Sequence, residues 1–367
     1  MAKRLKTQGK GDKRLLFVVC RLSRLLPQKT WLRRLVIGLI VLVVGSVGAM
    51  YGIAVWYIHA ESSRPQQVGV SFIPDYAQSL GVDPQKTMDA LLGIGVKQFR
   101  LVSYWSDIEQ TKGSYDFTQL DWQFQKAEAK HAKITLTLGL RQPRWPECHQ
   151  PDWVAGEPRS IWQPQLEAFM QAVIERYKAS PSLEKYQLEN EYFLGGFGIC
   201  TDFSRDRLVS EYKLIKNLDS AHPVIVGRSN NALGMPVGQP QPDEFSISVY
   251  KRVWDGNLSH RYLEYPFPAW FYGFVAGAQR IVNHRDMTLG ELQAEAWPPG
   301  SKSITETSLA EQNKSLNAKR FADRIEYGKA TGMRTIDLWG AEYWYYRLKV
   351  LHDPSLWNVA QSEFSKQ

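Results

Sequence analysis

The sequence lacks the short motifs that mark most metal-dependent, nucleotide-dependent and serine- or cysteine-dependent enzymes. No group of His, Asp and Glu residues has metal-ligand spacing, and no glycine-rich phosphate loop follows a strand-like segment. Neither a Gly-x-Ser-x-Gly segment nor a Cys/His pair at a strand end offers a nucleophile. We therefore predict no metal site and no cofactor, and the chemistry must come from other side chains.

An excess of basic residues is absent from most of the chain, although the formal net charge is +8. Residues 1–34 hold eleven Lys or Arg against one acidic residue, whereas residues 35–367 hold 34 basic and 36 acidic side chains. The larger part therefore carries a net charge of −2. A nucleic-acid partner is excluded on this ground, because such partners require clustered positive charge.

One uncharged and mostly apolar run, residues 35–58, follows the basic segment. As a helix it would reach about 36 Å, which is enough to cross a bilayer. The basic residues precede the run, and Trp56 and Tyr57 lie at its other end, so the positive-inside rule places residues 1–34 in the cytoplasm. We expect a single-pass membrane anchor with the remaining chain outside. A cleaved signal peptide is the alternative, although the run is long for one.

Cysteine is scarce, with three residues in the whole chain. Cys20 lies in the predicted cytoplasmic segment, whereas Cys148 and Cys200 lie in the predicted exported part. Oxidising conditions outside the cytoplasm would permit one disulfide between the latter two. Two unrelated buried thiols are the alternative.

Residues 59–66 are predicted to form a short polar linker, and residues 67–367 alternate between strand and helix patterns. Strands are expected over eight short apolar runs: 68–72, 98–103, 134–138, 186–190, 224–227, 245–249, 287–292 and 335–339. Helices are expected between most of them, notably over 84–92, 165–178, 205–218, 270–283 and 309–330. This alternation predicts a (β/α)8 TIM barrel. Residues 230–243 hold too many Pro and Gly for a normal helix, so that connection is predicted to be irregular.

Catalytic residues of such barrels lie at the carboxyl ends of the strands. The fourth predicted strand ends at Asn190 and Glu191, and the seventh carries Glu291 to the same level. Two carboxylates facing each other across the barrel mouth are typical of a retaining glycosidase. We therefore assign Glu191 as acid/base and Glu291 as nucleophile, with Glu295 as the competing nucleophile.

On these residues the chain resembles the retaining (β/α)8 glycoside hydrolases of clan A, which include family 5 cellulases, β-galactosidases and β-xylosidases. The resemblance covers roughly residues 67–360. It implies that Asn190 is a hydrogen-bond donor beside the acid/base. It also implies that Arg100, within the second strand, supports the nucleophile and that Tyr250 supplies a hydroxyl to it. Trp339, at the end of the eighth strand, would form the floor of the sugar subsite.

The end of the third strand departs from the pattern of this clan, because a histidine is expected nearer the strand. His149 could take that place, or Arg141 and Gln142 could line the subsite instead. Aromatic rings stack on the apolar face of a sugar, which suggests a substrate contact for several tryptophans, foremost Trp105 and Trp297. The further candidates are Trp145, Trp153, Trp254 and Trp344.

Together these features predict an extracytoplasmic retaining glycoside hydrolase that acts on a β-linked oligo- or polysaccharide. Transfer of the sugar to another sugar, in place of water, is compatible with the same residues. A catalytically silent carbohydrate-binding barrel, anchored at the surface, is the alternative from another class of function. All of these hypotheses imply a carbohydrate partner and a membrane, and none requires a cofactor.

Overall fold

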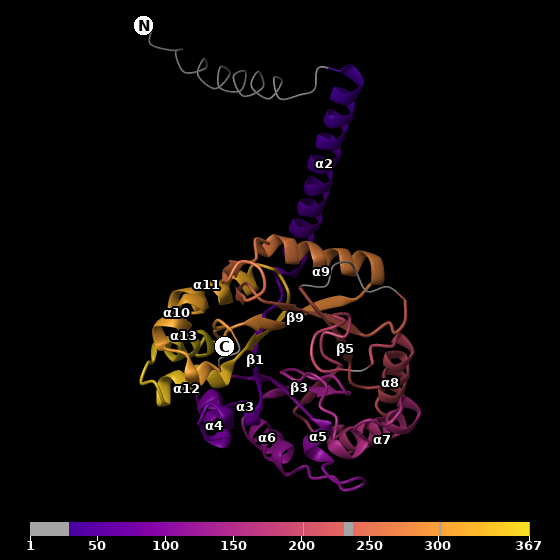
Figure 1. Cartoon of the computed structure of the whole chain (residues 1–367), viewed down its shortest axis with the longest axis vertical. Coiled ribbons are helices and arrows are strands. Elements are labelled where there is room, and N and C mark those ends of the chain that lie inside the picture. The colour runs from indigo at the N-terminus through magenta and orange to yellow at the C-terminus, as the bar shows by residue number, and fades with distance from the viewer. Residues whose placement is uncertain (1–28, 201, 231–237, 301–302, 367) are drawn as a thin grey trace. The chain divides into compact units, whose positions relative to one another are not determined.

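The computed structural model describes residues 29–200, 202–230, 238–300 and 303–366, so Cys20 and most of the basic segment lie outside the described residues. Two compact units divide the chain, residues 1–53 and residues 54–367. Helix α2 (Thr30–Glu61) begins in the first and ends in the second (Figure 1). It therefore extends beyond residues 35–58 at both ends and into the segment predicted as a linker.

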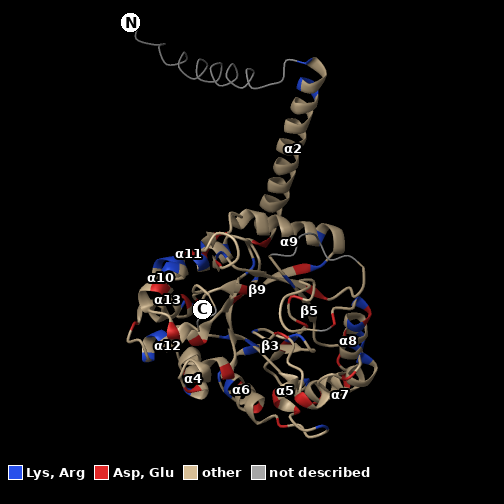
Figure 2. Cartoon of the chain, viewed as in Figure 1, with Lys and Arg blue, Asp and Glu red and all other residues tan. Residues whose placement is uncertain are grey.

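Helix α2 is long and apolar enough to cross a membrane, with a mean hydropathy of 2.3 in its most apolar window. Its only charged residues, Arg33, Arg34 and Glu61, lie near its two ends, and the stretch between them is uncharged (Figure 2). Membrane anchors and signal sequences share these properties.

The second unit is a closed barrel of parallel strands in the order β1-β10-β9-β6-β5-β4-β3-β2. Its eight strands are β1 (Gln67–Phe72), β2 (Gln98–Leu101), β3 (Lys133–Leu138), β4 (Leu183–Leu188), β5 (Val224–Ser229), β6 (Glu244–Val249), β9 (Asp286–Gln293) and β10 (Thr335–Trp339). Each overlaps a predicted strand, although β4 begins three residues and ends two residues before the predicted 186–190, and the predicted TIM barrel is confirmed. Every strand interior is buried, because side chains fill the barrel on one face and helices cover the other (Figure 1).

Helices follow most strands and form the outer layer (Figure 1). They are α3 (Pro74–Ser79), α4 (Pro84–Gly93), α5 (Trp105–Ile108), α6 (Thr118–Ala129), α7 (Arg159–Tyr177), α8 (Arg205–Leu218), α9 (Ala269–Asn283), α10 (Leu309–Ser315), α11 (Ala318–Lys329), α12 (Ala341–Lys349) and α13 (Ser355–Phe364), with single 3-10 turns at Asp152–Val154 and Ile304–Glu306. The helix expected over 309–330 is two helices, because Leu316 is extended and the Asn317 side chain caps α11. In the connection from β5 to β6, residues 231–237 lie outside the described residues, and the described remainder holds no helix.

A two-stranded hairpin was not foreseen from the sequence. Strands β7 (Arg252–Asp255) and β8 (Arg261–Glu264) pair antiparallel after β6. Each strand has only four residues and charged ends, so it shows no hydrophobic periodicity that would predict a strand. The hairpin brings Trp254 to the rim of the barrel.

The last two turns of α2, residues 54–61, pack against the barrel within the same unit. Tyr57 is 1% exposed, and the guanidinium of Arg280 on α9 lies 4.8 Å from the centre of its ring. Arg280 also donates to the carboxylate of Glu61 over 2.7 Å. Gly273 and Gly332 leave room for Ile58, because a Cβ on either would lie about 3.0 Å from its side chain or backbone. The segment that joins α2 to β1 is therefore short and held at its start.

Candidate active site

A cavity of about 600 Å³ lies at the carboxyl ends of the strands. Its lining includes most of the predicted site residues: Asn190, Glu191, Tyr250, Glu291, Trp297 and Trp339. They come from the ends of β4, β6, β9 and β10, which are distant in sequence and meet only because the sheet closes. The structure thus brings the two predicted carboxylates into one site.

Glu291 is held from two sides. Arg100 Nη1 donates to its Oε1 over 2.8 Å, and the Tyr250 hydroxyl donates to its Oε2 over 2.6 Å. Arg100 is 1% exposed and Glu291 3%, so the ion pair is shielded from water. Two charge-assisted hydrogen bonds, one to each carboxylate oxygen, fix the orientation of the Glu291 side chain.

Glu191 has a contrasting environment. It is 5% exposed, and burial followed by the charge of Glu291 raises its pKa to about 8. Its Oε1 has no hydrogen-bond partner among the residues that the structure describes. Its backbone φ of +42° lies in the left-handed region, which is costly for a residue other than glycine. Strain of this kind is concentrated at functional sites because the surrounding fold must enforce it.

Asn190 links the site to a third carboxylate that sequence analysis missed. Arg100 Nη2 donates to Asn190 Oδ1 over 2.8 Å, and Asn190 Nδ2 donates to Glu147 Oε2 over 3.1 Å. Burial raises the pKa of Glu147 to about 7, with the charge of Arg141 opposing the shift. Glu147 lies in the loop after β3, where we expected a histidine. The presence of an acidic residue in that loop was the only signal in the sequence that could have pointed to it.

Glu295, the competing nucleophile, belongs to a separate cluster in the same cavity. Its Oε1 accepts a hydrogen bond from Trp339 Nε1 over 2.8 Å, and its Oε2 pairs with Arg144 over 3.2 Å. The Arg144 guanidinium lies 3.3 Å from the ring centre of Tyr76 and 4.6 Å from that of Trp339. Glu295 thus orients aromatic and cationic groups of the cavity wall.

The tryptophans divide between cavity and core. Trp297, Trp254 and Trp145 line the cavity, and Trp145 is 62% exposed. Trp105 does not: it is fully buried and donates to Glu109 over 2.7 Å, so it is corrected from a sugar contact to a core residue. Trp344 is likewise fully buried, and Trp153 packs edge-on against Trp105.

The polar residues at the end of β3 support the site from behind. Gln142 and Arg141 are buried and bonded to backbone atoms, and neither lines the cavity. His149 stacks on Tyr104 at 3.5 Å, and burial lowers its pKa to about 4. Glu189 accepts hydrogen bonds from the backbone of this loop and pairs with Arg207, which makes it structural.

A disulfide joins Cys148 to Cys200, across the loops that follow β3 and β4. Cys148 directly follows Glu147, so the bond lies one residue from a carboxylate of the cavity. In the part of the chain that the structure describes, no cluster of three or more His, Cys, Asp or Glu side chains has metal-binding geometry.

No protein-family model matches the chain, and no curated protein sequence matches it. Solved structures do. A GH5_18 protein from Bifidobacterium longum subsp. infantis superposes with a TM-score of 0.54 at 11% identity, covering 82% of this chain and 78% of its own. Xylanase 10B from Thermotoga petrophila gives 0.53 at 13% identity, covering 82% and 94%. A β-galactosidase from Halorubrum lacusprofundi gives 0.50 at 15% identity, covering 74% and 52%, so the chain spans about half of its length.

These neighbours are glycoside hydrolases with clan A barrels, and the fold of the chain is of their kind. The resemblance drawn from the sequence is confirmed at the level of the fold. Sequence identities of 11–15% support a shared fold and nothing more, so the activity must be argued from the residues of the site.

Proposed function

We propose that the chain is a membrane-anchored retaining glycoside hydrolase with Glu191 as acid/base and Glu291 as nucleophile. The observation that carries the proposal is the contrast between two carboxylates in one cavity. Arg100 and Tyr250 each donate a hydrogen bond to Glu291, one to each carboxylate oxygen, and hold it in place. Burial raises the pKa of Glu191 to about 8, which favours its protonated form at neutral pH. Unlike environments for two neighbouring acids are the expected basis for dividing acid and nucleophile roles.

In the first step Glu291 attacks the anomeric carbon, and Glu191 gives its proton to the departing glycosidic oxygen. The glycosidic bond breaks as an ester bond forms between the sugar and Glu291. The ionised Glu191 then takes a proton from water, whose oxygen attacks the anomeric carbon and releases Glu291. Trp339, Trp297 and Trp254 would offer apolar faces to the sugar rings. A sugar hydroxyl in place of water would give transglycosylation.

The position outside the cytoplasm is part of the same proposal. It is supported by the uncharged apolar stretch of helix α2, by the basic residues that precede this stretch and by the Cys148–Cys200 disulfide. Disulfides persist in oxidising compartments and are rare in the cytosol. The substrate would accordingly be a glycan of the cell surface or its surroundings.

Mass spectrometry of the full-length chain in detergent, after exposure to 2-deoxy-2-fluoro glycosides of several sugars, tests the proposal. Such sugars slow the second step, so the glycosyl ester should accumulate on Glu291 and identify the preferred sugar. Glu295→Gln should still be labelled and Glu291→Gln should not. A label on Glu295 would assign the nucleophile there. No label with any sugar, together with retained glycan binding, would favour a silent carbohydrate-binding barrel.

A further inference from the structure

A second pocket, of about 500 Å³, lies on the other side of α3 from the catalytic cavity. Helix α3 presents Tyr76 and Ser79 to the cavity, and Pro74 and Gln78 to this second pocket. A helix with its side chains is about 10 Å across, so only one helix width separates the two spaces. Both open on the same end of the barrel, because α3 directly follows β1.

A smaller pocket of about 260 Å³ adjoins the catalytic cavity on the side of α3. It shares Tyr76, Arg144 and Trp145 with the catalytic cavity. It also includes Asp75, whose carboxylate accepts a hydrogen bond from Gln119 Nε2 over 2.8 Å. Gln119 in turn lines the second pocket, so one hydrogen bond joins the walls of the small pocket and the second pocket.

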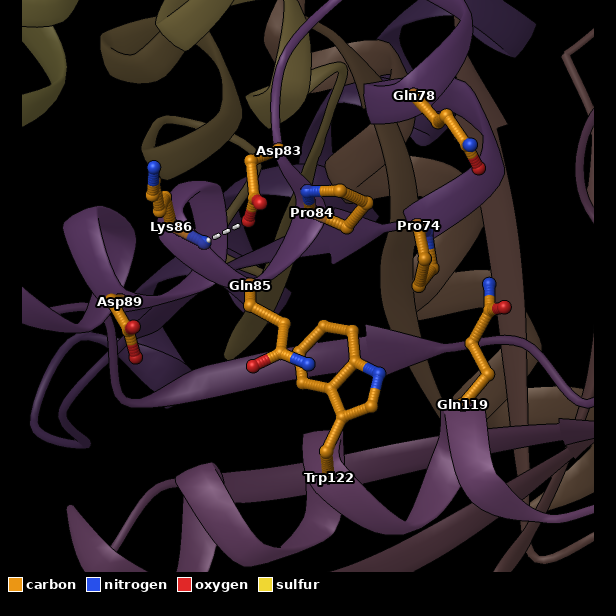
Figure 3. A pocket seen from close by; sticks show the side chains of 9 residues that line it. All are labelled: Pro74, Gln78, Asp83, Pro84, Gln85, Lys86, Asp89, Gln119 and Trp122. Carbon is orange, nitrogen blue, oxygen red and sulfur yellow. Dashed lines mark hydrogen bonds between the residues drawn. The ribbon is translucent and has the colours of Figure 1, made fainter.

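The second pocket combines an aromatic face with amide groups. Trp122 on α6 is half-buried and is held by an edge-on contact with Phe72 at 6.3 Å. Figure 3 shows the Gln85 side chain beside the indole ring, with Gln119 and Gln78 on the far side of the pocket. The Trp122 indole N–H and the side-chain amides of Gln78 and Gln85 form no hydrogen bond with any residue that the structure describes. These polar groups are available to a ligand, and the Lys126 ammonium lies 6.0 Å from the centre of the indole ring.

The formal charges around the pocket balance, because Asp83 and Asp89 are matched by Lys86 and Lys126. Lys126 pairs with Asp89 over 2.6 Å, and Asp83 caps α4 by accepting from the Lys86 backbone over 2.8 Å. An ionic ligand therefore finds no unbalanced cluster of either sign. An indole face with donor and acceptor amides suits a neutral sugar, whose C–H face is apolar and whose hydroxyls both donate and accept.

We propose that this pocket is a distal glycan subsite, occupied by a remote part of the same polymer that is cleaved between Glu191 and Glu291. The inference rests on the proposed glycosidase function and deepens it. It assigns a neutral polysaccharide, longer than the catalytic cavity can hold, as the substrate. Binding energy at Trp122 would then act on long substrates only, because short ones cannot reach it.

The test compares a long and a short substrate on full-length Trp122→Ala in detergent. The substrates are the β-linked hexasaccharide and the aryl glycoside of the sugar that labels Glu291. For the hexasaccharide, kcat/KM should fall about tenfold, as for the loss of one well-packed aromatic contact, and KM should account for most of it. For the aryl glycoside, kcat/KM should not change. Trp122→Phe should retain part of the effect.

Matched glutamine variants separate binding from packing. Gln85→Ala should weaken hexasaccharide turnover alone, and Gln361→Ala, an exposed glutamine on α13, should change neither substrate. Equal losses on both substrates, or no loss on either, would overturn the distal subsite.

If no sugar labels Glu291, the proposed hydrolase fails and the subsite is tested by binding. Fluorescence titration with β-linked hexasaccharides of glucose, xylose and galactose should then show binding to the wild-type chain that Trp122→Ala abolishes. Absence of binding by the wild-type chain, or binding unaffected by Trp122→Ala, would overturn the subsite on its own account.

Discussion

Glu147 is linked to both predicted catalytic carboxylates, Glu191 and Glu291. It accepts a hydrogen bond from Asn190, which also bonds Arg100, the partner of Glu291. Its negative charge also contributes to the raised pKa of Glu191, after burial and the charge of Glu291. Glu147 is thus a positioning residue that connects both catalytic candidates.

Glu147→Gln is expected to lower kcat/KM by about two- to tenfold, since a hydrogen bond to a charged acceptor is replaced by a weaker neutral one. It should also move the high-pH limb of the kcat/KM profile, near pH 8 in the wild-type chain, to lower pH. The sign follows because the high-pH limb records loss of the Glu191 proton, and removing a nearby negative charge lowers the pKa of Glu191.

A pH series on an aryl glycoside measures both effects. Glu326→Gln, an exposed acid on α11, is the control and should leave the profile unchanged. A rate loss without any movement of the limb would indicate that Glu147 acts on packing alone.

At the residue scale, the position of a residue along a strand was predictable from the sequence, whereas its hydrogen-bond and ion-pair partners were not. Asn190 and Glu191 follow the end of β4, and Glu291 lies two residues before the end of β9, so the rule that sites form at the carboxyl ends of the strands led to all three. Glu147 and Arg144 lie in a loop that contacts Asn190, after β4, and Glu295, after β9, so no local sequence pattern reveals their roles. The sequence likewise does not distinguish a buried tryptophan from one that lines a cavity. Trp105 was predicted to contact the substrate, although it belongs to the core.

At the scale of elements, the end of α2 is the least expected feature. A polar sequence after an apolar run suggests a free linker, yet Glu61 is 4% exposed and pairs with Arg280. Tertiary contacts override composition here, because α9 supplies a cation that compensates the buried acid. The eight strands, in contrast, were predictable, since buried parallel strands read as short apolar runs.

Tyr57→Ala in the full-length chain is expected to lower the free energy of unfolding of the barrel by about 3 kcal/mol, as for other buried aromatic side chains. The change removes a side chain that Arg280 covers and leaves a void beside α9. Tyr51→Ala is the matched control, because Tyr51 lies on the same helix and is 52% exposed. Denaturant unfolding in detergent, followed by near-UV circular dichroism, measures both. Equal effects from the two variants would show that residues 54–61 do not stabilise the barrel.

At the scale of the whole molecule, several buried acids make stability depend on pH. Burial raises the pKa of Glu147, Asp337 and Glu342 to about 7 and that of Glu191 to about 8. The folded chain holds these protons at pH values where the unfolded chain has lost them. Their contribution to stability is therefore full below about pH 4 and is lost as pH rises through 7 to 8.

His149 acts in the opposite direction at lower pH, since burial lowers its pKa to about 4. Its contribution is lost only as pH falls below its ordinary value of about 6.5. The Tm is thus expected to be higher at pH 6.5 than at pH 8.5, and calorimetry at fixed ionic strength measures it. Asp337→Asn should reduce the difference. A Tm that rises across this interval would contradict the assignment of buried, protonated carboxyls.

The disulfide has a consequence for handling the protein in the laboratory. Because Cys148 adjoins Glu147, the state of one sulfur bond and the placement of one cavity acid are coupled. A sample prepared with reducing agent, or expressed in a reducing cytosol, would lack this bond and would differ from the oxidised chain beside its cavity as well as at its surface. Assays of such a sample would describe a different molecule, so the oxidation state should be given with every rate that is measured.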